Sequence, residues 1–203
     1  MSTPELTVSV VVGSVRPGRM GIRVAKCVEA KLKSKGLTVH LIDPVELNLP
    51  LFLNRFDYIP EDERPPVLVE LQRKFAESDA VVVVSPEYNH TFSPVISNTL
   101  NYFYHPEFYY KVAGIVTYSM GSFGGSRAGV ALRPYLSELG FVTIPEQMTF
   151  SVVRGLLDDD GNVRETAGED AEALENSAES LTKELIWYSA LLKQGRAAGV
   201  PKW

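Results

Sequence analysis

The chain has 203 residues, 45% of them hydrophobic and 22% charged, enough to bury one core, so a single domain over residues 1–203 is expected. The formal net charge of −5 argues against nucleic acid and anionic membranes as partners. There is no apolar run of about 18 residues, no basic and apolar leader, and a single cysteine (Cys27), which predicts a cytoplasmic protein without membrane spans, intramolecular disulfides or multi-cysteine metal sites.

Five short apolar runs, rich in β-branched residues, are predicted to form strands. The runs are mostly continuous rather than alternating, a pattern typical of parallel strands that are covered on both faces. They lie at residues 6–13, 37–43, 79–86, 111–119 and 140–147.

Segments with a helical period separate these runs. The third of them begins with Ser93 and Pro94, which suit the N-cap and the first position of a helix. The inward-facing residues of the four segments are expected to be Val24, Val28 and Leu32; Val67, Leu68, Leu71 and Phe75; Ile96, Leu100 and Phe103; and Leu132, Leu136 and Leu139.

A longer helix is predicted over about residues 168–194. Its apolar stripe, from Ala171 to Leu192, suits either a helix that covers the sheet or a partner interface, and the first interpretation is preferred. Before this helix, the sequence DDDGN at 158–162 is expected to form a surface hairpin turn after FSVV.

The alternation of strand and helix predicts a doubly wound α/β fold. With five strands, the expected architecture is a flavodoxin-like parallel sheet in the order 2-1-3-4-5 with helices on both faces. Its ligand should lie beyond the carboxyl ends of strands one, three and four. Three loops rich in Gly, Pro and polar residues would meet there, at residues 13–21, 86–93 and 119–127.

The first loop offers an anion site at a helix N-terminus. Arg19 and Met20 stand where a P-loop needs Lys and Ser/Thr, and no G-x-G-x-x-G spacing is present, so neither nucleotide motif fits. What remains is Ser14, Arg16 and small residues beside backbone N–H groups, an arrangement that suits a phosphate monoester. A solvated turn with incidental arginines is the competing interpretation.

The second loop carries groups that suit a planar heterocycle. Pro86 fixes the turn, and backbone groups of Glu87 and Tyr88 could bond the edge of a ring on which Tyr88 packs. Asn89 offers both a donor and an acceptor. Ordinary surface exposure competes with this interpretation for Glu87 and His90, and whether His90 contacts a ligand stays open.

The third loop contains glycines that allow close approach of its backbone to something flat. Gly121, Gly124 and Gly125 precede another helix N-terminus, whose amides favour negative charge on nearby ring atoms. A merely flexible loop is the alternative. For Arg127 and Arg133, which follow this loop, surface solvation is the preferred interpretation, and whether Arg127 contacts a ligand stays open.

Together, the motifs GSVRPGRMG, SPEYNHTFSPVISNTLNYFY and SMGSFGGSRAG resemble the NADPH-dependent FMN reductase family, whose flavodoxin-like members include quinone, azo-dye and chromate reductases. The resemblance runs from about residue 6 to 147. It implies noncovalently bound FMN, NADPH or NADH as hydride donor, a small-molecule electron acceptor, and a homodimer or tetramer. It also implies that the flavin carries the chemistry, so no catalytic side chain and no metal ligand is expected.

The resemblance implies that all three loops contact the cofactor. Residues 14–22 would hold the FMN phosphate, and residues 86–89 would line the isoalloxazine ring. Residues 119–124 would border the pyrimidine side of that ring. Many members place Ser or Asn shortly after the loop arginine, whereas this chain has Arg19, so backbone amides and Arg19 are expected to replace that ligand. The expected cofactor-binding residues are Ser14, Arg16, Arg19, Met20, Gly21, Ile22, Pro86, Glu87, Tyr88, Asn89, Ser119, Met120, Gly121 and Gly124.

Other classes of function compete with the reductase. A flavodoxin-type one-electron carrier, a flavin-binding regulatory module and a flavin-free α/β binding protein share the fold. The arginines at 16 and 19 and the Gly-rich third loop favour the reductase.

An aromatic stretch at 102–110 is expected to serve two purposes. Phe103 suits the core, while the other aromatic residues are too many for one core face, and Tyr is favoured at interfaces. With residues 51–58, this stretch is expected to wall the flavin across a dimer contact.

Overall fold

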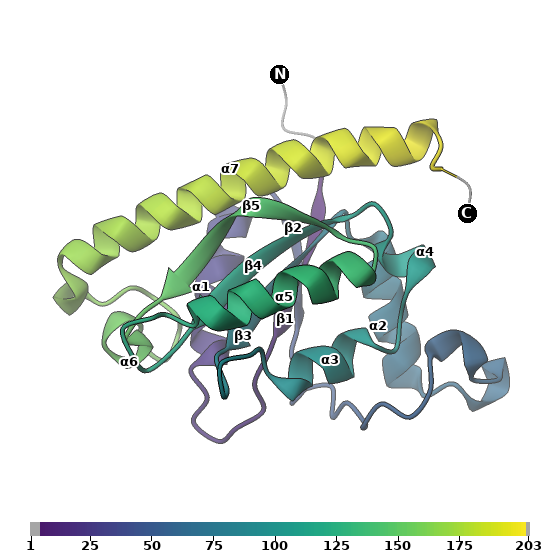
Figure 1. Ribbon diagram of the computed structural model, residues 1–203, viewed down its shortest axis with the longest axis horizontal. Coiled ribbons are helices and arrows are strands. Elements are labelled where there is room, and N and C mark those ends of the chain that lie inside the picture. Colours follow the sequence, from purple (N-terminus) through teal and green to yellow (C-terminus); the bar gives the residue numbers. More distant parts are fainter. Residues whose placement is uncertain (1–4, 202–203) are drawn as a thin grey trace.

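A computed structural model describes residues 5–201 of the chain and shows a five-stranded parallel sheet in the order β2-β1-β3-β4-β5 (Figure 1). The predicted order is therefore confirmed. The strands are β1 (Thr7–Val12), β2 (Thr38–Ile42), β3 (Ala80–Pro86), β4 (Val112–Tyr118) and β5 (Val142–Phe150). The α-helices are α1 (Gly21–Ser34), α2 (Pro66–Glu77), α3 (Pro94–Leu100), α4 (His105–Phe108), α5 (Ser126–Glu138), α6 (Val153–Leu156) and α7 (Glu169–Ala198). Short 3₁₀ helices span Phe56–Tyr58, Glu61–Glu63 and Glu165–Ala167.

The burial of the strands follows their place in the sheet. β3 lies between β1 and β4, and every residue of β3 and β4 is buried. The edge strand β2 pairs with β1 alone and stays mostly half-buried. The apolar runs that form the central strands β3 and β4 thus correspond to strands covered on both faces.

Two helical layers enclose the sheet and divide the core into two halves. α1 and α7 cover one face, where Val28 and Leu185 pack with Val10. α2, α3 and α5 cover the other, where Phe75 and Leu132 pack with strand valines. Figure 1 shows the long α7 running along one side of the sheet, opposite α2, α3 and α5.

The stripe on α7 covers the sheet, as preferred from the sequence. Leu174, Leu181 and Leu185 are buried among the core residues of that face. The opposite face of the helix keeps Trp187 and Leu191 exposed, at 58% and 47%. Among residues 5–201, no helix has the combined length and apolar character that crossing a bilayer requires.

Several boundaries and one packing prediction differ from the sequence analysis. β5 continues to Phe150 and α7 to Ala198, and the short helix α6 precedes the DDDGN turn. The turn itself is closed by an antiparallel bridge between Leu157 and Val163. Val153 and Leu156 of α6 are buried in the core half beneath α1 and α7, and Arg196 ties the last turns of α7 to Asp79, contacts that a local apolar pattern does not record.

The aromatic stretch contributes more to the core than was predicted. Besides Phe103, Tyr102 and Phe108 are also buried, so two residues that were expected at an interface belong to the core. The short helix α4 turns the segment back beneath α2, and Phe75 lies 5.5 Å from Phe103 and 5.2 Å from Phe108 between ring centroids. Tyr104 and Tyr109 stay half-buried.

Candidate functional site

The carboxyl ends of β1, β3 and β4 open into a cavity of about 350 Å³. All three predicted loops contribute to its wall, as expected at the switch point of a doubly wound sheet. The lining residues are Ser14, Arg16, Pro17, Gly18, Arg19, Met20, Pro86, Glu87, Tyr88, Tyr118, Ser119, Met120 and Arg154. Of the predicted cofactor-binding residues, those outside this lining are Gly21, Ile22, Asn89, Gly121 and Gly124.

The first loop places a hydroxyl and a cation beside Tyr88. Ser14 is buried, and its Oγ lies 3.1 Å from the Tyr88 Oη. The Arg16 Cζ lies 5.7 Å from the centroid of the Tyr88 ring, within reach of a cation–π contact. The loop turns at Gly18, whose φ of 66° is a left-handed conformation that glycine adopts without strain. α1 then begins at residue 21, so its first amides lie next to the cavity.

Arg19 is engaged by the protein itself. Its Nη1 and Nη2 donate to the two carboxylate oxygens of Asp43 at 2.6 and 2.5 Å, and Nη1 also donates to the Ser14 carbonyl at 2.8 Å. The side chains of Arg19 and Asp43 are only 12% and 6% exposed. A bidentate pair of this kind fixes the planar guanidinium, so Arg19 holds the loop against the end of β2.

Tyr118, the last residue of β4, packs its ring against the start of α1, where the first loop ends. A Cβ at Gly21 would lie 2.5 Å from the Tyr118 Oη, so the start of α1 needs a glycine to admit this ring. Burial raises the pKa of the Tyr118 phenol above its ordinary value, which keeps it protonated at neutral pH. The sequence analysis missed Tyr118 because it ends an apolar strand and carries no local signal of a site.

The second loop is a tight turn that Tyr88 and Thr91 close through an antiparallel bridge. Asn89 and His90 occupy its tip, with φ values of 51° and 65°, and lie outside the cavity lining. The Asn89 side chain, which was expected to contact a ring, is therefore not part of the cavity wall, whereas Tyr88 is. Ser93 holds this loop to the first one, because its Oγ donates to the carbonyl of Gly13 at 2.5 Å rather than capping α3.

Glu87 connects the second loop to the third. Its Oε1 accepts a hydrogen bond from the Arg127 Nη1 at 2.7 Å, and its Oε2 accepts one from the Arg127 backbone N–H at 3.2 Å. Burial acts to raise the pKa of Glu87, but these hydrogen bonds outweigh it and hold the pKa below its ordinary value. Arg127 also lies over the ring of Phe123, at 4.6 Å, so this guanidinium has protein partners.

The third loop reaches the cavity through Ser119 and Met120. Its glycines serve the packing of the loop on the sheet. A Cβ at Gly124 would lie 3.0 Å from Thr149 Cβ, and one at Gly125 would lie 3.0 Å from backbone atoms of Tyr118. Both glycines have positive φ values, 59° and 83°.

Arg154, in α6, is a second lining residue that the sequence analysis missed. The segment before it is tied to the third loop, since the N–H groups of Val152 and Val153 donate to the carbonyls of Gly121 and Ser119 at 3.1 and 3.2 Å. No motif marks this arginine, because it enters the site from beyond β5. Within residues 5–201, no group of His, Cys, Asp and Glu side chains is arranged to hold a metal ion.

Comparisons with known proteins point to one family. The model of the family described as "NADPH-dependent FMN reductase" matches residues 6–154. The "NAD(P)H-dependent FMN reductase LOT6" of Saccharomyces cerevisiae is 26% identical over 152 residues, 66% of this chain and 75% of the relative. The "NADPH:quinone oxidoreductase" of Arabidopsis thaliana is 30% identical over 149 residues, 70% of this chain and 74% of the relative.

Two further likenesses extend this comparison. The "NADPH azoreductase" of Bacillus sp. (strain OY1-2) is 31% identical over 117 residues, 58% of this chain and 60% of the relative. The solved structure of FerB, a flavoenzyme NAD(P)H:(acceptor) oxidoreductase from Paracoccus denitrificans, matches with a TM-score of 0.71 at 24% identity. That match covers 90% of this chain and 98% of the FerB chain, and it shows the common fold.

Proposed function

The chain belongs to the NADPH-dependent FMN reductase family, and from that premise we propose that the cavity at the carboxyl ends of β1, β3 and β4 is where this FMN-dependent NAD(P)H reductase holds its cofactor and meets its acceptor. The observation that carries the proposal is the convergence of all three loops on one cavity. A quinone, an azo compound, free flavin or a metal oxyanion is the class of acceptor that we propose. Two relatives are named as a quinone oxidoreductase and an azoreductase.

The donor set of the cavity fits FMN. Ser14, Arg16 and the first amides of α1 offer a hydroxyl, a cation and backbone N–H groups, the combination that a phosphate monoester needs. Pro86 and Tyr88 offer an apolar edge and an aromatic face for a planar ring system. When bound, FMN would accept a hydride from NAD(P)H and pass its reducing equivalents to the acceptor.

The side chains of the cavity hold and orient rather than transfer protons. Glu87 is ionised and engaged by Arg127, and Tyr118 retains its proton because burial raises its pKa. Neither group is therefore poised to exchange a proton at neutral pH. This supports the expectation that no single side chain is indispensable for the chemical step, with water as the proton source for a quinone product.

The visible spectrum of the purified protein tests the proposed function. We expect flavin bands at about 375 and 450 nm that bleach within seconds when NADPH is added without oxygen and return when a quinone is added. A buffer addition without NADPH is the control for slow photoreduction. Bands that persist under both NADPH and NADH would point to a flavodoxin-type carrier or a flavin-binding regulatory module. A colourless protein that takes up no FMN would refute the proposed site.

We further propose that the protein acts as a homodimer or a dimer of dimers. The loop at 51–58 supports this, because Leu51, Leu53 and Tyr58 are 76%, 88% and 69% exposed. The loop is nevertheless well anchored: the Phe52 N–H donates to the Asn98 Oδ1 at 2.7 Å. A fixed loop that presents large apolar side chains is suited to a partner surface.

A further inference from the structure

Three arginines line the cavity of a chain whose formal net charge is −5. The pairing of these arginines decides which of them are available to a ligand. Arg19 donates to both carboxylate oxygens of Asp43 and to the Ser14 carbonyl, so most of its N–H groups are already engaged by the protein. Its charge is balanced there, and it has little to offer a phosphate.

Arg16 and Arg154 differ from Arg19. Within the part of the chain that the structure describes, neither makes an ion pair with an acidic side chain, and the single acid among the lining residues, Glu87, is taken by Arg127. The Arg16 Cζ lies 5.7 Å from the centroid of the Tyr88 ring. The cavity wall therefore carries two guanidinium groups without a balancing anion.

The backbone on both sides of Arg154 is anchored to the rest of the fold. Val153 and Leu156, on either side of it in α6, are buried in the core half beneath α1 and α7. The backbone N–H of Val153 donates to the Ser119 carbonyl in the third loop at 3.2 Å. These anchors hold the segment against the cavity, so Arg154 lines the wall together with the first loop.

Two guanidinium groups that line one cavity can both attract a multiply charged anion, whose negative charge offsets their repulsion. A phosphate monoester carries close to two negative charges at neutral pH and accepts several charge-assisted hydrogen bonds. We propose that Arg154 is a second cationic ligand of the FMN phosphate beside Arg16, in the role that the motif alone would assign to Arg19. This inference rests on the proposed function and adds a residue that selects FMN over riboflavin.

The test compares two ligands that differ only in the phosphate. The full chain, freed of flavin, is titrated with FMN and with riboflavin, and the dissociation constants are read from the quenching of flavin fluorescence. For Arg154→Gln we expect the dissociation constant of FMN to rise about tenfold or more, as one charge-assisted contact is lost, while that of riboflavin changes less than about twofold. Arg154→Lys should recover part of the loss.

Arg73→Gln is the matched control, because it removes an exposed arginine of α2 whose partners are Glu70 and Glu77, and it should change neither dissociation constant. The inference is overturned if Arg154→Gln raises the dissociation constants of FMN and riboflavin by the same factor, or if it changes neither of them. It is also overturned if FMN binding is intact and only the KM for NADPH rises relative to NADH, which would place Arg154 at the dinucleotide. A wild-type protein that binds neither flavin would overturn the proposed function as well.

Discussion

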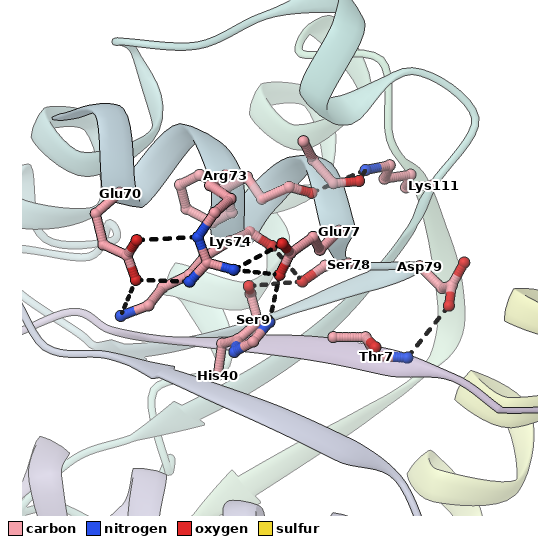
Figure 2. Close-up of polar contacts among 12 residues, drawn as sticks. Thr7, Ser9, His40, Glu70, Arg73, Lys74, Glu77, Ser78, Asp79 and Lys111 are labelled. Atoms are coloured by element: carbon pink, nitrogen blue, oxygen red, sulfur yellow. Dashed lines mark hydrogen bonds and ion pairs between the residues drawn. The ribbon is translucent and has the colours of Figure 1, made fainter.

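At the scale of single residues, Lys111 is the clearest case of a charge held in the core. It precedes β4, is 5% exposed, and its Nζ donates to the carbonyls of Phe75 and Ala76 at 2.8 and 2.9 Å at the end of α2 (Figure 2). Burial, followed by repulsion from Arg196, lowers the pKa of Lys111 from 10.5 to about 8.

This shift predicts a pH dependence of stability. Because the folded pKa lies below the unfolded value, the unfolded chain binds more protons between pH 8 and 10.5, and the contribution of Lys111 to stability rises with pH through that window. Between about pH 7.5 and 9.5, we expect the free energy of unfolding of wild type to gain about 1–2 kcal/mol relative to Lys111→Met.

Urea unfolding at the two pH values measures the effect of Lys111, and Lys183→Met is the control, since Lys183 is 74% exposed. The control should follow wild type. An equal difference between wild type and Lys111→Met at both pH values would show that the buried amine does not titrate in this window.

At the scale of elements, the Arg19–Asp43 pair joins the first loop to the end of β2. The Asp43 Oδ1 also accepts the N–H of Val45 at 3.0 Å, so the carboxylate organises both segments. This contact depends on the strand order, since β2 and β1 are neighbours in the sheet although α1 separates them in sequence.

Breaking the Arg19–Asp43 pair should be costly because it leaves a charge without its partner at low exposure. We expect Asp43→Asn and Arg19→Gln each to lower the free energy of unfolding by about 3 kcal/mol, and the double variant to lose less than their sum. Chemical denaturation of the four proteins measures the coupling. Additive losses would mean that Arg19 and Asp43 do not stabilise each other, and the loop would then owe its shape to other contacts.

At the scale of the whole molecule, the two ends of the sheet are specialised. The carboxyl ends carry the cavity, whereas the amino ends hold a network in which Asp79 accepts from Lys193 Nζ at 2.9 Å and from Arg196 Nη2 at 2.8 Å. The Asp79 contacts fasten the C-terminal part of α7, and Figure 2 shows Asp79 beside the start of β1. The anchoring of α7 is thus separate from the site.

The proposed dimer makes a prediction at this same scale. We expect wild type to elute on sizing at micromolar concentration as a dimer or tetramer, and Leu53→Glu to shift it towards the monomer, because a charge would replace an 88% exposed leucine at the proposed contact. Val130→Glu is the control, as that exposed residue lies on α5, outside the 51–58 and 102–110 segments. Monomeric wild type would argue strongly against a flavin site shared across an interface.

Much of the fold and part of the site were predictable from local patterns. Continuous apolar runs mark strands such as β3 because burial on both faces excludes polar residues, and Gly, Pro and polar residues mark the loops that follow. For the same reason, Ser14, Arg16 and Tyr88 were recognised as cavity residues: each lies in a loop directly after a strand. The family resemblance, carried by the same three loops, is confirmed by the match over residues 6–154.

The partners of these residues were decided by the tertiary structure alone. Arg19 meets Asp43, Ser93 meets Gly13, and Arg154 enters the wall from beyond β5. The physical reason is that burial determines the composition of a segment. The burial of a strand or the exposure of a loop can therefore be recognised from consecutive residues. The partner of a charge, in contrast, depends on strand order and on helices that return from distant parts of the chain.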